Sequence, residues 1–287
     1  MKKRFILVFF ILFLISALMS TLFFKFAGVK TDGNGGEFNI SIKTKENITD
    51  YGKTYTYDVK EVESISVKTQ SMPITIKRED RKDILVIIES EKDNNYDVIT
   101  QLENKTLKIE IDENSKNQIG FLELNDVDII IPNNYELKSI HANSITGYIN
   151  TADVGNLNIS NTSGNIDIEN GYDDLIVTNV SGYISIGGEY SKINANNVAG
   201  EIELESDIFD EAILNTVSGN IELYVSKDFS ANYYFSTISG KTDFDIENNY
   251  KKINKNQGII GEYKEENKND FKITVKTVTG EFNLNNN

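Results

Sequence analysis

One short phrase recurs along this chain at a nearly fixed interval, and it constrains the fold more than any other feature. The phrase is Ile, Val or Thr, then Ser, Thr or Ala, then Gly, and its glycines are Gly147, Gly164, Gly182, Gly200, Gly219, Gly240 and Gly280. Successive glycines lie 17, 18, 18, 19, 21 and 40 residues apart, and Gly261 falls near the position missing from the last gap. A fixed period of about 18 residues predicts a solenoid, in which each repeat forms one coil and no coil folds alone.

Apolar residues alternate on both sides of each glycine. Five residues before it stand Ala142, Ile159, Val177, Ala195, Leu214, Phe235 and Val275. Two residues after it stand Ile149, Ile166, Ile184, Ile202, Ile221, Thr242 and Phe282. Period-two alternation predicts two short strands per coil, with the apolar side chains directed into a shared interior. The predicted class is therefore all-β, a β-solenoid resembling a parallel β-helix.

A column of small polar residues stands three positions before the glycine. It reads Ser144, Asn161, Asn179, Asn197, Thr216, Thr237 and Thr277. Parity places this column on the inward face at the corner between the strands, where hydroxyl and amide groups can bond to turn backbone. We interpret it as a structural ladder, because an unpaired buried polar group costs about 1–3 kcal/mol.

The glycine itself has a predicted physical role. A tight bend between strands commonly needs a positive φ, which glycine adopts without a Cβ clash. Replacement of Gly182 or Gly200 by Val is therefore expected to lower stability.

The chain divides into five predicted segments. Residues 60–136 are an irregular first part of the solenoid, with Met72 at the glycine place of an early coil, and residues 137–287 are the regular coils. Residues 25–59 form a polar tether. Residues 5–24 lack charge and can cross a membrane as one helix, and residues 1–4 are a basic cytoplasmic stub.

This apolar segment predicts a single-pass protein of the cell membrane, with the C-terminal domain extracytoplasmic. An uncleaved signal anchor is favoured, because neither Ser20 nor Ala27 has a small residue two places before it to complete a cleavage site, and a cleaved signal peptide stays the alternative. The chain has no cysteine, which excludes a lipoprotein anchor.

The charge balance limits the partners. The formal net charge is −15, and residues 1–30 contain five bases and no acid, so the remainder carries −20. Such a surface repels nucleic acid and anionic headgroups, so no nucleic-acid partner is expected. The expected partners are the membrane, through the N-terminal helix, and an envelope protein or polysaccharide.

No catalytic, cofactor-binding or metal-binding residue is predicted. The single histidine, His141, lies between inward positions and is expected to face solvent. Three carboxylate pairs share a strand face: Asp126 with Asp128, Glu201 with Glu203, and Asp243 with Asp245. Alternation directs each pair outward, where charged side chains normally lie, and glycosidases instead set two carboxyls across a cleft. Asp32, Asn34 and Glu37 lack the remaining spacing of a calcium loop.

The segment Val-Ser-Gly-x-Ile-x-Ile, as in residues 180–186, resembles the bacterial putative-adhesin β-strand-repeat family of unknown function, which includes LiaG-like envelope proteins. The resemblance covers roughly residues 60–287. It includes the Ile-Pro run that ends at Pro132 and the closing run from Thr277 to Phe282. Many members carry an N-terminal membrane segment, and the family provides no catalytic residue to carry over.

These observations favour a membrane-anchored, non-catalytic binding or scaffold module of the bacterial envelope, in adhesion or envelope stress. Tyr148 and Tyr183 each follow a turn glycine. Exposed tyrosines can anchor a ligand, but scattered exposed aromatics are also ordinary, so no binding residue is predicted. Two alternatives stay open: an enzyme acting on polysaccharide through surface carboxylates, and a regulatory partner of a membrane signalling complex. The oligomeric state and the ligand are not predicted.

Overall fold

The computed structural model describes residues 47–49, 52–89, 96–113, 126–226, 232–244, 251–254, 259–262 and 271–286, all within one compact unit, Thr44–Asn287. Strands predominate in them, which confirms the predicted all-β class, and one short 3-10 turn, η1, covers Val59–Glu61. The strands are β1 (Asn47–Thr49), β2 (Gly52–Asp58), β3 (Ser64–Lys68), β4 (Ile74–Glu79), β5 (Asp83–Glu89), β6 (Tyr96–Glu103), β7 (Thr106–Glu113), β8 (Asp126–Pro132), β9 (Ser139–Ser144), β10 (Ile149–Ala152), β11 (Gly155–Ser163), β12 (Ile166–Ser181), β13 (Ile184–Ala199), β14 (Ile202–Glu205), β15 (Phe209–Ser218), β16 (Ile221–Val225), β17 (Asn232–Thr237), β18 (Lys241–Phe244), β19 (Lys251–Asn254), β20 (Ile259–Glu262), β21 (Lys272–Thr279) and β22 (Glu281–Asn286).

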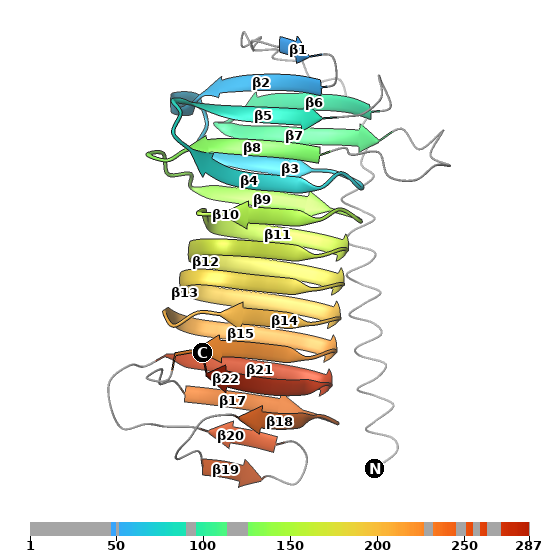
Figure 1. Cartoon of the computed structure of the whole chain (residues 1–287), viewed down its shortest axis with the longest axis vertical. Helices are drawn as coiled ribbons and strands as arrows, with labels where there is room; N and C mark the ends of the chain where they lie inside the picture. The colour runs from blue at the N-terminus through green and yellow to red at the C-terminus, as the bar shows by residue number, and fades with distance from the viewer. Residues whose placement is uncertain are drawn as a thin grey trace. The chain divides into compact units, whose positions relative to one another are not determined.

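The strands pair in two ladders that share the turns (Figure 1). Ladder A holds the strands before the turn glycines, in the spatial order β6, β7, β3, β9, β11, late β12, late β13, β15, β21, β17. Ladder B holds the strands after them, in the order β1, β2, β5, β8, β4, β10, early β12, early β13, β14, β16, β22, β18. Pairing is parallel through the middle and antiparallel where β6, β5, β2 and β1 are added.

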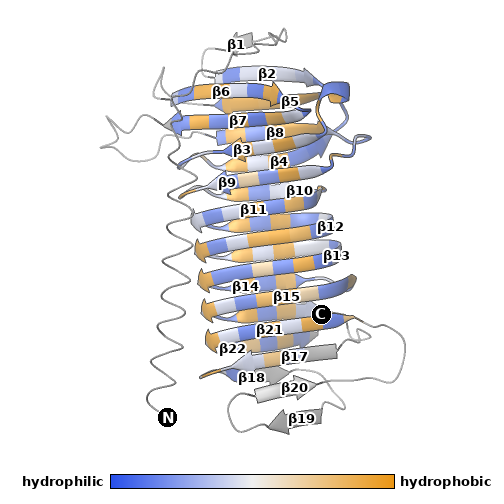
Figure 2. Ribbon diagram, turned by 180° about the vertical axis from the view of Figure 1, so that it is seen from behind, coloured by the Kyte–Doolittle hydropathy of each residue, from blue (hydrophilic) through white to orange (hydrophobic). Residues whose placement is uncertain are grey.

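Equivalent residues of successive coils lie in register. In ladder A, Ile159 pairs with Val177, which pairs with Ala195, and in ladder B, Ile166 pairs with Ile184. All of these side chains are buried, as the alternation predicts, and Figure 2 shows hydrophobic and hydrophilic residues alternating along the strands. Full burial of one aliphatic side chain stabilises the fold by about 1.5–3 kcal/mol, so the stacked columns form a continuous core.

The polar column at the inner corner is buried in every coil, as predicted. Where the residue is Asn, its amide donates to a glycine carbonyl of the preceding coil: Asn179 Nδ2 lies 2.8 Å from Gly164 O, and Asn197 Nδ2 lies 2.8 Å from Gly182 O. Where it is Thr, as at Thr216, the hydroxyl has no hydrogen-bond partner among the described residues. The ladder therefore ties coils together through Asn and only fills space through Thr.

The turn glycines are required for two separate reasons. Gly182 has φ of +126°, which confirms the expected positive φ at that corner. Gly280 has no positive φ, but a Cβ there would overlap the carbonyl oxygen of Gly219 on the next coil. Close backbone approach between coils, which the phrase alone does not reveal, therefore also selects glycine.

The coils do not stack in chain order. The C-terminal strands β21 and β22 lie between β15–β16 and β17–β18, so Gly280 stacks on Gly219, and Gly240 stacks on Gly280. The expectation that Gly261 marks a further coil is wrong, because Gly261 lies in β20, which pairs antiparallel with β19. At the other end, β3 and β4 lie between β7–β8 and β9–β10. Met72 takes the glycine place, since its carbonyl lies against Gly147.

The first strands extend into the segment expected as a tether. Residues 52–58 form β2, which pairs with β5, because Tyr55 and Tyr57 alternate and are buried against the core. No helix within the described ranges is long and apolar enough to cross a bilayer. The predicted membrane segment, Phe5 to Phe24, lies outside those ranges, as do residues 25–46.

Candidate functional site

The outward side of ladder B gathers tyrosines and carboxylates. The first and third residues after each turn glycine point away from the core, because the second and fourth are buried. In consecutive coils the first position holds Tyr148, Asn165, Tyr183, Glu201 and Asn220. The third holds Asn150, Asp167, Ser185, Glu203 and Glu222. Parallel stacking at about 4.8 Å thus converts a sequence repeat into a continuous face.

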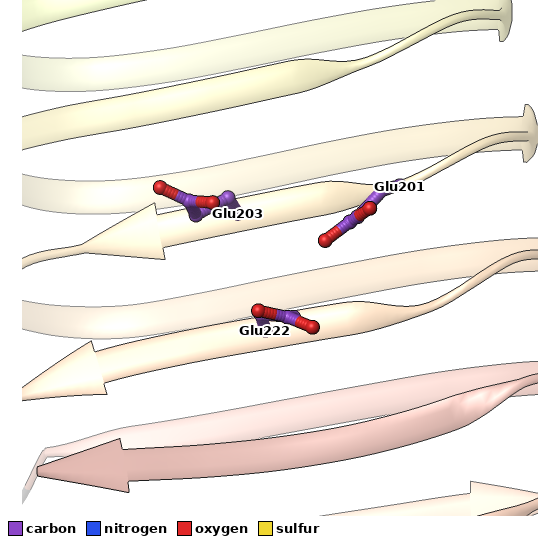
Figure 3. Close-up of side chains that lie close together, drawn as sticks. All are labelled: Glu201, Glu203 and Glu222. Carbon is purple, nitrogen blue, oxygen red and sulfur yellow. The ribbon is translucent and has the colours of Figure 1, made fainter.

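Three of these carboxylates come together at one point (Figure 3). Glu201 directly precedes β14, Glu203 lies in β14, and Glu222 lies opposite Glu203 in β16. One oxygen of each lies within 4.8 Å of the other two, and all three side chains are half-buried. The pairing of Glu201 with Glu203 was recognised in the sequence, and Glu222 joins them only because the next coil is stacked in register.

The electrostatics of this cluster are unfavourable to the charged form of Glu201. Burial first, and then the charges of Glu222 and Glu203, raise the pKa of the Glu201 carboxyl. The hydroxyl of Tyr183 donates to Glu203. The hydroxyl of Tyr224 donates to Glu222 at 2.6 Å, and this bond raises the pKa of Tyr224 to about 12.

A similar bond forms between coils further along the face. The hydroxyl of Tyr148 donates to Asp167 at 3.0 Å, so a tyrosine of one coil again meets a carboxylate of the next. Burial, followed by this bond, raises the pKa of Tyr148 to about 12. The raised pKa values keep the hydroxyls of Tyr148 and Tyr224 protonated, so both remain hydrogen-bond donors.

The chemistry open to this face is cation binding. Carboxylate oxygens are ligands that Ca²⁺ prefers, and Glu201, Glu203 and Glu222 are the one group of such side chains in the described residues that converge closely enough to hold a metal ion. They also suit ammonium or guanidinium groups. Hydrolysis of a glycosidic bond needs two carboxyls on opposite sides of that bond, whereas these three lie side by side on one sheet.

The other sequence candidates lie apart. His141 is exposed on β9 of ladder A. Asp126 and Asp128 share a face of β8, where burial, Asp128 and Glu89 raise the pKa of Asp126, and Lys77 lies 3.8 Å from Asp128. The Asp243 and Asp245 pair and the Asp32, Asn34 and Glu37 group fall outside the described side chains. Of the candidates that the structure describes, neither His141 on β9 nor the Asp126 and Asp128 pair on β8 lies at the Glu201 cluster on β14 and β16.

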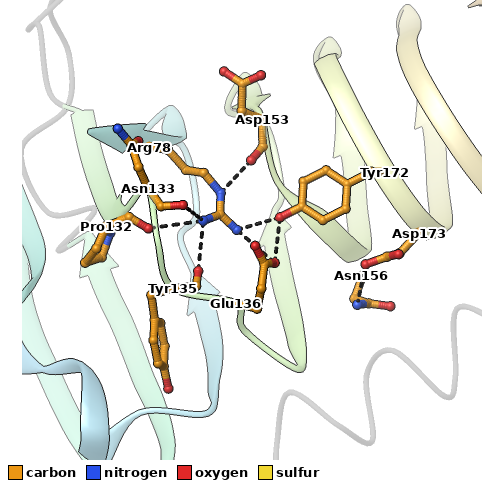
Figure 4. Close-up of polar contacts among 9 residues, drawn as sticks. All are labelled: Arg78, Pro132, Asn133, Tyr135, Glu136, Asp153, Asn156, Tyr172 and Asp173. Atoms are coloured by element: carbon orange, nitrogen blue, oxygen red, sulfur yellow. Dashed lines mark hydrogen bonds and ion pairs between the residues drawn. The ribbon is translucent and has the colours of Figure 1, made fainter. Parts of the chain in front are cut away.

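Arg78 was missed by the sequence reasoning, although its side chain is only 10% exposed (Figure 4). Its guanidinium donates to the carbonyls of Asp153, Pro132, Asn133 and Tyr135, and to the side chains of Glu136 and Tyr172. These acceptors belong to the β8–β9 connection, the β10–β11 corner and β12. All guanidinium nitrogens are used within the fold, so Arg78 clamps the coils together and does not offer itself to a ligand.

A second surface feature follows the turns. The residue two before the turn glycine is apolar and at least 41% exposed at Ile145, Val180, Val198, Val217 and Ile238. The preceding position is buried in each coil, and the following position carries a hydroxyl except at Ala199, so this column forms a narrow apolar ridge. A β-branched residue favours the extended backbone that the corner needs, which accounts for the column without a ligand.

A protein-family model matches most of this chain. A family model described as Toastrack DUF4097 matches residues 62–192 and again residues 173–285. No curated protein matches the sequence.

Solved structures of three bacterial proteins are among those similar to this chain. A putative cell adhesion protein from Clostridium sporogenes has 13% identity over 85% of this chain and 100% of its own, with a TM-score of 0.38. A putative adhesin from Bacteroides fragilis has 16% identity over 82% and 98%, with a TM-score of 0.41. A putative lipid binding protein from Parabacteroides distasonis has 15% identity over 82% and 97%, also with a TM-score of 0.41.

Proposed function

This chain belongs to the Toastrack DUF4097 family, and from that premise we propose that it is a non-catalytic binding module of the bacterial cell envelope. In this proposal the strands form a β-solenoid held outside the cell by the apolar segment Phe5 to Phe24. The coils display their outward side chains to a macromolecular partner.

One observation carries the proposal: the polar groups of ladder B repeat in register on an open sheet face. Glu203 pairs with Glu222 across neighbouring strands, and Asp167 pairs with Ser185 in the same column. A row of this kind presents many equivalent contacts at about 4.8 Å spacing, which suits an extended partner. Catalysis instead requires a few groups converging on one reacting atom.

The membrane part of the proposal is supported by the sequence. Residues 5–24 contain no charge and follow Lys2, Lys3 and Arg4, which favours a cytoplasmic N-terminus. Protease digestion of intact cells tests it: the domain is expected to be digested from outside, and gel mobility reports whether the segment is retained. Protection of the domain in intact cells would contradict the proposed location.

Crosslinking in intact cells tests the binding role. A photoreactive residue at Asn150 or Ser185, both outward on ladder B, is expected to crosslink to an envelope protein or polysaccharide. The same group at Asn158 on ladder A serves as a comparison of faces. If neither face crosslinks to any macromolecule, the binding role is wrong.

Two alternatives have direct tests. A polysaccharide hydrolase would lose activity on wall polymer when Glu201 is changed to Gln, because the raised pKa of Glu201 is the feature that suits a general acid. A regulatory partner of a signalling complex would lose signalling, while surface display persists, when residues 5–24 are exchanged for an unrelated membrane span.

A further inference from the structure

The outward side of ladder B from β10 to β16 carries one sign of charge. We name it the acidic face and define it by Asp167, Glu201, Glu203 and Glu222 together with the tyrosines Tyr148 and Tyr183. Residues 139–226, which supply this face, contain thirteen Asp and Glu and a single Lys, Lys192. Lys192 lies in late β13 on ladder A, because it pairs with Asp174 and Glu211.

Several carboxylates elsewhere in the described residues are paired with bases. Glu63 bonds to Lys105 at 2.5 Å, and Glu211 bonds to Lys272 at 2.6 Å. Glu136 lies 3.1 Å from Arg78. Within the same described ranges, none of the four carboxylates of the acidic face has an ion-pair partner. Asp167, Glu203 and Glu222 each accept from a tyrosine hydroxyl, and Glu222 also accepts from the Asn283 amide at 3.5 Å.

This arrangement is unfavourable to folding. Glu203 and Glu222 are in direct register on neighbouring strands, and like charges directly opposite each other destabilise a sheet. On ladder A, two facing outward residues are neutral amides that bond to each other: Asn215 pairs with Asn196 and donates to it at 2.9 Å. Like charges that face each other without a compensating base lower the stability of the sheet, and an arrangement of this kind is expected at a functional surface.

We propose that the acidic face binds an extended, Lys- and Arg-rich segment of another protein. The inference rests on the proposed binding function and adds the chemistry of the partner. Charge complementarity selects a basic partner, and the exposed ring of Tyr148 offers cation–π contacts to ammonium and guanidinium groups.

The backbone spacing of the glutamates suits an extended peptide. Glu201 and Glu203 stand two residues apart along one strand direction, so their Cα atoms are about 6.6–6.8 Å apart, and one carboxylate oxygen of each lies within 4.8 Å of the other. Alternate side chains of an extended peptide recur at the same interval, so a peptide lying along β14 sets one base against each carboxylate. Glu222, one strand away at about 4.8 Å, lets a long Lys or Arg side chain reach between strands.

Peptide binding to the full-length chain in non-ionic detergent tests the proposal. The probe is a synthetic peptide in which Lys and Thr alternate, and the comparison peptide has the same composition with its lysines in one block. We expect the alternating peptide to bind more tightly, and its affinity to fall as salt rises. Equal affinity for the two peptides would contradict the proposal that the partner binds as an extended chain along β14.

Matched variants localise the site. Glu201→Gln, Glu203→Gln and Glu222→Gln combined are expected to weaken binding by about ten-fold or more. Asp174→Asn, Glu189→Gln and Asp210→Asn make the same change in net charge at exposed positions off the acidic face, and they are expected to retain binding. Equal affinity of both variants would overturn the proposal. The triple Gln variant relieves repulsion among the carboxylates, so its melting temperature is expected to equal or exceed that of the wild type. A loss of binding can then be distinguished from a loss of folding.

The cellular crosslinking experiment separates this inference from the proposed function. If the wild type crosslinks to a partner and the acidic-face variant crosslinks equally to the same partner, the basic-segment proposal is wrong and the binding function stands. If the wild type crosslinks to nothing, the binding function is wrong as well.

Discussion

The guanidinium of Arg78 donates to the hydroxyl of Tyr172 at 2.5 Å and lies 5.9 Å from the centre of the Tyr172 ring. These two residues are 94 positions apart in the chain, on β4 and β12. Their contact fastens the early coil of β3 and β4 to the regular coils that follow it. Early and regular coils are thus joined by side chains as well as by strand pairing.

Arg78→Met is expected to reduce the free energy of unfolding by about 2–4 kcal/mol, because it leaves carbonyl acceptors and Glu136 without their donor. Lys77→Met, on the same strand but 38% exposed at the side chain, is the control and is expected to change little. Urea unfolding of both variants measures the difference. Equal stability of the two would show that Arg78 is not a clamp.

Gly182→Ala is expected to destabilise the fold strongly, because the new Cβ meets the carbonyl of Gly164 and the backbone has φ of +126°. Gly187→Ala, in β13 just after this turn, is the matched control: the nearest non-neighbouring atom to the new Cβ, Ile168 O, would lie at 3.5 Å, an ordinary contact. We expect Gly187→Ala to be neutral or to stabilise by about 0.4–1 kcal/mol. Thermal unfolding distinguishes them, and similar melting temperatures would contradict the close-approach argument.

Thr216→Asn is expected to stabilise the protein by about 1 kcal/mol. Thr216 stands in the column where Asn197 bonds to Gly182 O, and its own hydroxyl has no partner. An Asn amide there can reach the carbonyl of Gly200. The reverse change, Asn179→Thr, is expected to be destabilising. Chemical denaturation of both variants is the measurement, and a destabilised Thr216→Asn would show that the ladder has no room for the amide at that coil.

Glu63→Gln and Glu201→Gln are expected to change stability in opposite directions at neutral pH. Hydrogen bonds from Lys105 and Lys138 lower the pKa of Glu63 to about 2, so its contribution is present above the ordinary value of 4.5 and lost as pH falls toward 2. Burial and the charges of Glu222 and Glu203 raise the pKa of Glu201, so stability falls as pH rises from 4.5 through that raised pKa.

Unfolding measured from acidic to neutral pH checks both variants. Glu63→Gln is expected to be less stable than the wild type at neutral pH and equal to it well below the pKa of Glu63. Glu201→Gln is expected to be more stable at neutral pH, with the gain disappearing as the wild-type carboxyl is protonated. A destabilised Glu201→Gln at neutral pH would show that the Glu201 charge is compensated.

Engineered cysteines test the order of the coils. Ser218 pairs with Thr279, so Ser218→Cys with Thr279→Cys is expected to form a disulfide. Ser218→Cys with Ser239→Cys is not, because β21 lies between β15 and β17. The native chain has no cysteine to interfere, and gel mobility with and without reductant reads the result. A disulfide in the second pair alone would indicate stacking in chain order.

Much of the fold could be predicted because its signals are local. The burial of Ile159 and Val177, the inward Asn column and the glycine corner all follow from period-two alternation and from a repeat near 18 residues. Only part of the candidate site could be predicted from the sequence. Glu201 and Glu203 stood out as a pair, whereas Glu222 lies a full coil away in the chain.

The sequence by itself determined which residues line the interior and where each coil turns, since both depend on neighbours within a few positions. Only the tertiary structure decided which coil lies against which. Coils with matching columns offer nearly equivalent edges, so stacking order is a competition among long-range pairings that no local pattern encodes. That competition placed β21 and β22 inside the stack, brought Arg78 to Tyr172, and assembled the acidic face from separate repeats.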